Sequence, residues 1–273
     1  MSNALPQSLV LIGAGKMGSS MLEGWLRIGI DPASIALIDP RPSDEMVEIA
    51  NEKGMKLNPS AKELPPAEVV VLATKPQMLD TAAPAVQAFI HPKTLLISIL
   101  AGKTLGDLAA RLPNAAAIVR AMPNLPASVQ RGATGSAAGK GVSAAQRATA
   151  DELLRSIGAV EWLDDEKLID AVTAVSGSGP AYVFHLVECL AAAGVEVGLP
   201  ADIAERLARA TIEGAGELLF QSPLTPATLR QNVTSPGGTT AAALEVLMAD
   251  DGLRPLMRKA VAAARRRAEE LSG

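Results

Sequence analysis

Short apolar runs alternate with mixed segments through the first half of the chain. Runs such as AEVVVLAT are apolar at consecutive positions, as expected of a parallel strand that is covered on both faces. Helical stretches separate these runs, and this order predicts a doubly wound, mostly parallel α/β sheet of the Rossmann type. The expected strands are 8–13, 34–39, 67–74, 94–100 and 115–122, with weaker ones at 132–138 and 158–163, and the expected helices are 16–28, 43–53, 77–90, 104–111 and 143–156.

The pattern changes near residue 164. Strand-like runs disappear and long helical stretches follow, so we expect an α/β domain over 1–164 and an all-α domain over 165–273. The helices have broad apolar faces that are hard to bury within that length, which indicates a dimerisation interface. The expected helices are 180–197, 200–221, 238–249 and 252–271.

Composition narrows the class of protein. The chain is 48% hydrophobic and 20% charged, which is typical of a globular protein. A net charge of −4 argues against a nucleic-acid partner, and no apolar run is long enough to span a membrane. The single cysteine, Cys189, excludes an internal disulfide and fits the reducing cytoplasm, and we expect it to be buried and unreactive.

The segment GAGKMG has the glycine spacing of a dinucleotide-binding loop. It follows a predicted strand and opens a predicted helix, which is the context that the motif requires. The first glycine allows the tight turn, the second allows a pyrophosphate to approach, and the third lets the helix pack on the strand. Free N–H groups at the helix start favour phosphates, so we expect NAD(H) or NADP(H) to bind Gly13, Ala14, Gly15, Lys16, Met17 and Gly18.

Other cofactor contacts are expected at the carboxyl ends of the strands, where ligands of open α/β sheets gather. Asp39 ends the second strand, where an acid hydrogen-bonds the ribose 2′-hydroxyl of NAD. Arg41 can instead hold the 2′-phosphate of NADP, and the sequence leaves both alternatives open. The loops after the strands 67–74 and 94–100 add Ala73, Thr74, Lys75, Pro76, Ala101 and Gly102.

Dedicated acid–base machinery is not evident in the sequence. No cluster of His, Cys and carboxylate residues has metal-ligand spacing, so we expect no metal, and no serine lies in a G-x-S-x-G elbow. The segment SGSGPAYVFHLVE lacks the lysine that we would expect of a β-hydroxyacid dehydrogenase. An acceptor that is already protonated, such as an iminium ion, needs no such pair, because the cofactor carries the chemistry.

A break interrupts the helical half at 235–238, in the sequence SPGG. Proline and paired glycines end a helix at a cost, which indicates that the backbone there has another role. We expect free N–H groups at Gly238, Thr239 and Thr240, which would form an anion site at the start of the next helix. The threonines can also simply cap that helix, and both roles are compatible.

Five segments in this order resemble pyrroline-5-carboxylate reductases: VLATKPQ, SILAGK, VRAMPNLPASVQRG, AVSGSGPAYVF and LRQNVTSPGGTTAAALE. The resemblance implies a Rossmann domain and a helical domain that intertwines with a second subunit, in dimers that often assemble into decamers. It implies reduction of 1-pyrroline-5-carboxylate to L-proline by hydride from NAD(P)H, the last step of proline biosynthesis.

The same resemblance implies roles for individual residues. Thr240 meets the ring nitrogen of the substrate and takes part in catalysis, while Gly238 and Thr239 bind the substrate carboxylate. Asn232 contacts the cofactor from the helical domain. Ser176, Gly177 and Glu166 are further substrate-site residues, and Met122, Pro123 and Asn124 line the loop beside the nicotinamide.

Two other functions remain open at the level of sequence. One is a different imine or β-hydroxyacid reductase on the same architecture, which substrate profiling would separate from a pyrroline-5-carboxylate reductase. The other is a non-catalytic dinucleotide sensor, which would bind the cofactor without oxidising it.

Overall fold

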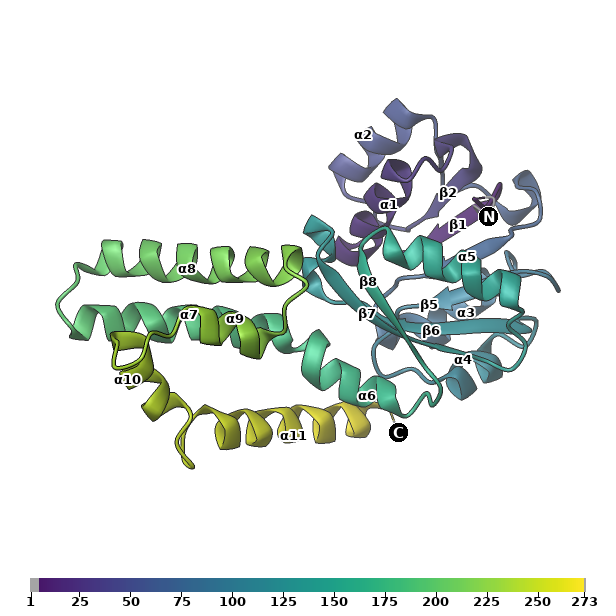
Figure 1. Ribbon diagram of the computed structural model, residues 1–273. Helices are drawn as coiled ribbons and strands as arrows, with labels where there is room; N and C mark the ends of the chain where they lie inside the picture. Colours follow the sequence, from purple (N-terminus) through teal and green to yellow (C-terminus); the bar gives the residue numbers. More distant parts are fainter. Residues whose placement is uncertain (1–4, 273) are drawn as a thin grey trace. The chain divides into compact units, whose positions relative to one another are not determined.

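The computed structural model describes residues 5–272 and consists of two compact units (Figure 1). The first unit runs up to Gly177 and includes the chain from Arg265 onward, and the second is Ser178–Ala264. The sequence places the boundary at residue 164, where the predicted strands end. The chain between 164 and 177 packs on the sheet, since a Cβ on Gly135 would lie 2.7 Å from the side chain of Val172.

The first unit is built on one eight-stranded sheet with the order β3-β2-β1-β4-β5-β6-β7-β8. All neighbouring strands are parallel except β6 and β7, which are antiparallel. The prediction of a doubly wound, mostly parallel Rossmann sheet is therefore confirmed. The strands are β1 (Leu9–Ile12), β2 (Ile35–Ile38), β3 (Lys56–Leu57), β4 (Val69–Leu72), β5 (Leu95–Ser98), β6 (Ala117–Met122), β7 (Gly132–Ala138) and β8 (Gly158–Leu163).

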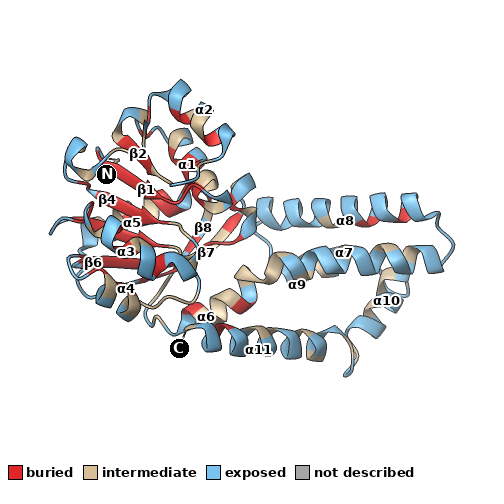
Figure 2. Ribbon diagram, turned by 180° about the vertical axis from the view of Figure 1, so that it is seen from behind, coloured by how far each residue is buried: buried red, intermediate tan, exposed pale blue. Residues whose placement is uncertain are grey.

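Helices cover both faces of this sheet, which explains why its strands are apolar at consecutive positions (Figure 2). The odd-numbered residues of β1 join a core with Trp25 and Leu153, and the even-numbered residues join a core with Leu79 and Leu108. The Trp25 indole N–H also donates to the carbonyl oxygen of Leu153 over 3.1 Å. The helices of this unit are α1 (Lys16–Arg27), α2 (Asp44–Lys53), α3 (Leu79–Gln87), α4 (Leu105–Arg111), α5 (Ala144–Arg155) and α6 (Leu168–Val172).

The second unit is helical, as predicted. In both ribbon views α7 and α8 run side by side (Figures 1 and 2). Small residues allow this, because a Cβ on Gly194 would lie only 3.2 Å from that of Ala204. The helices are α7 (Gly179–Glu196), α8 (Ala201–Gln221), α9 (Pro226–Asn232), α10 (Thr239–Leu247) and α11 (Leu253–Ser272), the last turns of which belong to the first unit.

The long helices leave much apolar surface uncovered within the single chain. No residue of α7 is buried, and only Ala204 and Ala208 are buried in α8. Cys189, which we expected to be buried, is exposed, because none of residues 5–272 covers its face of α7. None of the described helices is both long and apolar enough to cross a membrane. The large exposed apolar side chains of α7 and α8 are Val183, Phe184, Leu186, Leu190, Val195, Ile203, Leu207, Leu218, Leu219 and Phe220.

Three short elements are absent from the prediction: β3, α6 and α9. β3 and α6 are too short for hydrophobic periodicity to reveal them, and α9, with the sequence PATLRQN, has too few apolar residues to show a period. A π-helical turn, Thr173–Gly177, also follows α6 and ends the first unit. Such turns occur frequently at functional sites.

Candidate active site

The glycine loop between β1 and α1 has the backbone geometry of a phosphate cradle. Gly13 has φ +94, and a Cβ there would lie 2.8 Å from the carbonyl group of Ala73. A Cβ on Gly18 would collide with the carbonyl oxygen of Gly13, so this glycine lets α1 pack against the loop. A Cβ on Gly15 would meet nothing within 4 Å, so the space above the middle glycine is open. The three glycines therefore separate into a turn, an open approach and a close packing contact, as a dinucleotide requires.

Backbone donors at the start of α1 face this opening. Gly15 is the N-cap of α1 and no side chain caps the helix, so the first N–H groups, from Lys16 to Gly18, have no intrahelical acceptor. Such a helix start attracts phosphate through its N–H groups and its dipole. The end of the neighbouring strand β2 holds the loop in place, because the Gly13 amide donates to the Ile38 carbonyl oxygen over 2.9 Å.

A cavity of about 490 Å³ adjoins the loop within the first unit. It extends from the loop over the start of α2 and over the chain after β6. Its lining includes Ala14, Gly15, Lys16, Met17, Ser43, Met46, Leu125 and Ser128.

Two strand ends lie next to the glycine loop. Asp39, after β2, accepts a hydrogen bond from the Ala14 N–H over 2.9 Å. Ala73, after β4, lies against Gly13, and the following Thr74 has a buried hydroxyl with no hydrogen-bond partner among the described residues. A buried hydroxyl without a partner beside an open phosphate cradle fits a polar ligand there. Lys75 is exposed and precedes the 3₁₀ turn that begins at Pro76.

The loop after β5 has a different neighbour. Gly102 has φ +69, and a Cβ there would lie 2.7 Å from the carbonyl oxygen of Leu271. This loop, with the exposed Ala101, is therefore placed against the end of α11. No hydrogen bond among residues 5–272 joins either residue to the glycine loop.

The residues that follow β6 meet the π-helical turn. The side chain of Met122 lies beside Gly177, because a Cβ on that glycine would be 3.3 Å from the Met122 Cε. The Asn124 amide donates to the Ser176 carbonyl oxygen over 2.9 Å and accepts from the Ala133 N–H over 2.8 Å. Met122 and Asn124, which the sequence assigns to the cofactor site, thus pack against Ser176 and Gly177, which it assigns to the substrate site. Pro123, between Met122 and Asn124 in the chain, is buried.

Glu166 belongs to a network around a buried arginine. Its Oε1 lies 3.0 Å from Nη1 of Arg120 and accepts the Leu105 N–H over 2.7 Å. Arg120 is only 3% exposed, and its Nη2 lies 3.8 Å from Asp170, which in turn accepts a hydrogen bond from Ser272. This network fastens α6 and the end of α11 to β6.

The helical unit carries the second group of predicted residues. Gly237 has φ +68, and Gly238 is the N-cap of α10, which no side chain caps, so neither threonine acts as a cap. The expectation of three free amides is wrong for Gly238, since its N–H donates to the Ser235 carbonyl oxygen over 3.1 Å. The break itself forms a turn that uses this amide, so the free N–H groups begin at Thr239. Asn232 is exposed at the end of α9.

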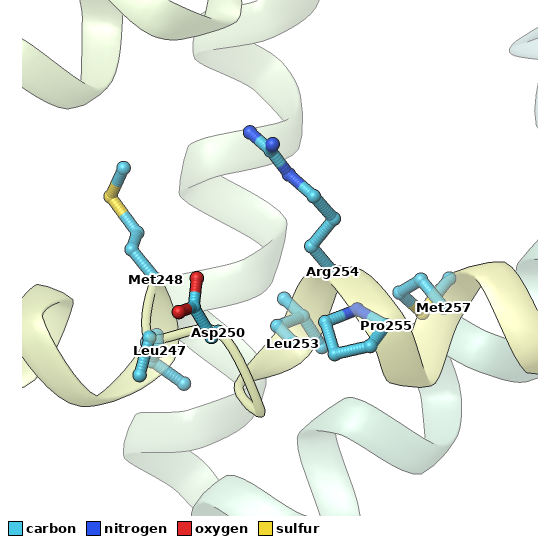
Figure 3. A pocket seen from close by; sticks show the side chains of 8 residues that line it. Leu247, Met248, Asp250, Leu253, Arg254, Pro255 and Met257 are labelled. Atoms are coloured by element: carbon cyan, nitrogen blue, oxygen red, sulfur yellow. The ribbon is translucent and has the colours of Figure 1, made fainter.

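A separate hollow of about 400 Å³ lies at the turn between α10 and α11 (Figure 3). Its lining is mostly aliphatic and contains none of the predicted site residues. The side chains are those of Leu247, Met248, Ala249, Asp250, Leu253, Arg254, Pro255 and Met257.

Sequence reasoning missed two residues that support the site. Arg120 interrupts the apolar strand AAAIVRAM, and an arginine within a buried strand signals a charged partner across the fold. Asn58, beyond β3, hydrogen-bonds the backbone of Asp39 at both the N–H and the carbonyl group, over 2.8 Å each. No signal in the sequence pairs these two loops. No group of three or more potential metal ligands gathers within residues 5–272.

Comparison with known proteins decides the family. The family model for pyrroline-5-carboxylate reductase dimerisation matches residues 166–271. A pyrroline-5-carboxylate reductase of Pseudomonas aeruginosa is 41% identical over 97% of this chain and 96% of that protein. The chain belongs to the pyrroline-5-carboxylate reductase family.

Solved structures agree with this family assignment. A pyrroline-5-carboxylate reductase from Coxiella burnetii has a TM-score of 0.90 at 36% identity, over 98% of this chain and 99% of that one. The Plasmodium falciparum pyrroline carboxylate reductase, solved with NADP bound, has a TM-score of 0.78 at 28% identity, over 97% and 98% of the two chains. A second family model, NADP oxidoreductase, coenzyme F420-dependent, matches residues 8–102. The residues that this second model matches include the glycine loop at 13–18.

Proposed function

We propose that this chain reduces 1-pyrroline-5-carboxylate to L-proline with hydride from NADH or NADPH, as the final step of proline biosynthesis. The observation that carries the proposal is the end-to-end similarity to the Pseudomonas aeruginosa reductase, which covers both units. An imine that is already protonated needs no dedicated acid–base pair, because the cofactor carries the chemistry.

The first unit holds the cofactor. The N–H groups of Gly15, Lys16, Met17 and Gly18 bind the pyrophosphate at the start of α1. The Thr74 hydroxyl donates to a polar group of the ligand, because it has no acceptor within the described protein. When bound, the nicotinamide supplies the hydride. Further contacts come from Ala73, Lys75, Pro76, Ala101, Gly102, Met122, Pro123 and Asn124, with Asn232 from the helical unit.

The helical unit holds the substrate at the start of α10. The free N–H groups of Thr239 and Thr240 bind the substrate carboxylate, since anions are stabilised at a helix start. The Thr240 hydroxyl forms a hydrogen bond with the ring nitrogen and so orients C5, the carbon that accepts the hydride. Hydride addition to C5 of the protonated imine turns the electron pair of the C=N double bond into a lone pair on nitrogen. The neutral secondary amine then takes up a proton from water, so the protein need supply no base.

Self-association completes the enzyme. The uncovered apolar side chains of α7 and α8 pack against a second copy, because exposure of so many in solution is unfavourable. Dimers of this kind assemble further into a decamer. The enzyme works in the cytoplasm, where the exposed Cys189 stays reduced.

The test is oxidation of NADH or NADPH in the presence of 1-pyrroline-5-carboxylate, followed at the nicotinamide absorbance band. Wild type should oxidise the cofactor and release proline. Thr240→Ala should lower kcat by about tenfold or more, and Thr240→Ser, which keeps the hydroxyl, should recover most of it. Thr149→Ala on α5 is the matched control, because that hydroxyl bonds only its own helix. Cofactor binding without oxidation by any wild-type preparation would refute the proposal.

A further inference from the structure

Asp39 is held in a fixed position at the end of β2. One carboxylate oxygen accepts the Ala14 N–H over 2.9 Å, and the other accepts the Arg41 N–H over 2.9 Å. The first of these donors belongs to the glycine loop itself. The carboxylate therefore forms part of the rim of the phosphate cradle.

The backbone of Asp39 is also held, by Asn58. The side-chain amide of Asn58 accepts from the Asp39 N–H and donates to its carbonyl oxygen, over 2.8 Å in each case. Asn58 itself has φ +52, a left-handed conformation that asparagine tolerates, and its N–H donates to the Leu37 carbonyl oxygen over 2.7 Å. Asp39 thus cannot turn aside without the loss of hydrogen bonds on either side of the strand end.

We propose that Asp39 makes this chain prefer NADH to NADPH. This inference rests on the proposed function, which names these two cofactors as the alternatives. A dinucleotide on a glycine loop of this type directs its adenosine ribose to the acid at the end of the second strand. Ribose hydroxyls donate to a carboxylate that still has free lone pairs. A 2′-phosphate instead brings a charge of about −2 against a fixed negative charge.

Arg41 does not compensate for this repulsion. Its backbone N–H is bound to Asp39, and its side chain is exposed to solvent, where an ion pair gains little. For Arg41 to bind the 2′-phosphate without repulsion from Asp39, the carboxylate would have to move away and lose its hydrogen bonds from both the Ala14 and the Arg41 N–H. Arg41 becomes a phosphate ligand only when the Asp39 charge is removed.

The test uses the full chain and measures cofactor binding without substrate, by the fluorescence of the reduced nicotinamide. Wild type should bind NADH at least about tenfold more tightly than NADPH. Asp39→Ser should lower this ratio by about tenfold or more. The double variant with Arg41→Ala should again bind NADPH more weakly than Asp39→Ser alone does. Asp39→Asn removes the charge at constant size and serves if the serine variant does not fold. Asp31→Ser, at the other end of β2, is the matched control and should leave the ratio within about twofold.

Tighter binding of NADPH than of NADH by wild type would overturn the inference, and so would a ratio that neither Asp39 variant changes. The oxidation assay separates this inference from the proposed function. Faster turnover with NADPH than with NADH leaves the reductase in place and removes the role of Asp39. If the protein binds NADH more tightly but reduces 1-pyrroline-5-carboxylate with neither cofactor, the role of Asp39 stands and the proposed function fails.

Discussion

The side-chain amide of Asn124 donates to the carbonyl oxygen of Ser176 over 2.9 Å and so fixes the π-helical turn at the end of the first unit. The same amide accepts the N–H of Ala133 on β7 over 2.8 Å, and Asn124 is only 8% exposed. The amide therefore joins the loop after β6, the strand β7 and the turn before the helical unit in one buried bridge.

Asn124→Asp should disturb this bridge at nearly constant volume. The carboxylate can still accept from Ala133, but it cannot donate to Ser176 while it is ionised. We expect a loss of about 1–3 kcal/mol in the free energy of unfolding, measured by urea denaturation at pH 7. Asn114→Asp, at an exposed turn, is the control and should change stability by less than about 0.5 kcal/mol. Equal stability of the two variants would show that the bridge contributes nothing.

The glycine loop allows binding and folding to be separated. Gly15→Ala adds a methyl group where nothing lies within 4 Å, at an ordinary φ of −70. It should leave the unfolding midpoint unchanged but weaken NADH binding by about tenfold, because the methyl group occupies the approach of the pyrophosphate. Gly18→Ala should instead lower stability, because its Cβ would collide with the Gly13 carbonyl oxygen.

Gly106→Ala on α4 is the control for both glycine variants. The nearest atom to its Cβ is the Thr104 hydroxyl oxygen at 3.6 Å, which is ordinary contact. This change should affect neither property adversely, since alanine is the better helix former. If Gly15→Ala binds the cofactor as tightly as wild type does, the glycine loop does not bind the pyrophosphate in the way described.

Arg120 and Glu166 should act on stability. Arg120→Met leaves the carboxylates of Glu166 and Asp170 without their common partner, and we expect a loss of about 2–4 kcal/mol in the free energy of unfolding. Glu166→Gln should cost less, because its amide oxygen can still accept the Leu105 N–H. Arg206→Gln, in an exposed pair with Asp202, is the control and should cost about 0.5 kcal/mol at most.

The Glu166→Gln variant also decides a prediction made from sequence. The structure turns this carboxylate toward Arg120 and Leu105, so we expect KM for 1-pyrroline-5-carboxylate to stay within about twofold of wild type. A rise of about tenfold in KM, with stability intact, would instead place Glu166 at the substrate.

Asp107 provides a test of pH dependence at the start of α4. Burial raises the pKa of Asp107, but hydrogen bonds from the Thr104 hydroxyl and N–H, with the charges of Arg111 and Lys103, outweigh burial and lower the pKa overall. A carboxyl with a lowered folded pKa stabilises the protein above its unfolded pKa of about 3.9, and this contribution is lost as the pH falls through the folded pKa. Asp107→Asn should therefore be less stable than wild type by about 1 kcal/mol at pH 7. The difference should shrink below about pH 4, and a constant difference in urea midpoints would contradict it.

The sequence by itself determined the architecture. Consecutive apolar positions in β1, β4 and β5 required a sheet covered on both faces, and the glycine spacing required a tight turn and an open helix start. The apolar faces of α7 and α8 indicate an interface from the sequence alone. Periodicity and motif spacing are local signals, and these features depend on local signals alone.

The tertiary structure decided which groups remain available for chemistry. Asp39 is fixed by Asn58 and by the Ala14 amide, the Gly238 amide is used by Ser235, and Glu166 is bound to Arg120. Asn58, Ala14 and Arg120 lie on other loops or on a distant strand, whereas Ser235 lies in the same turn as Gly238, where the backbone geometry of the turn directs the amide. Hydrogen bonds of this kind depend on direction and on distances fixed by the whole fold, which no pattern along the chain records.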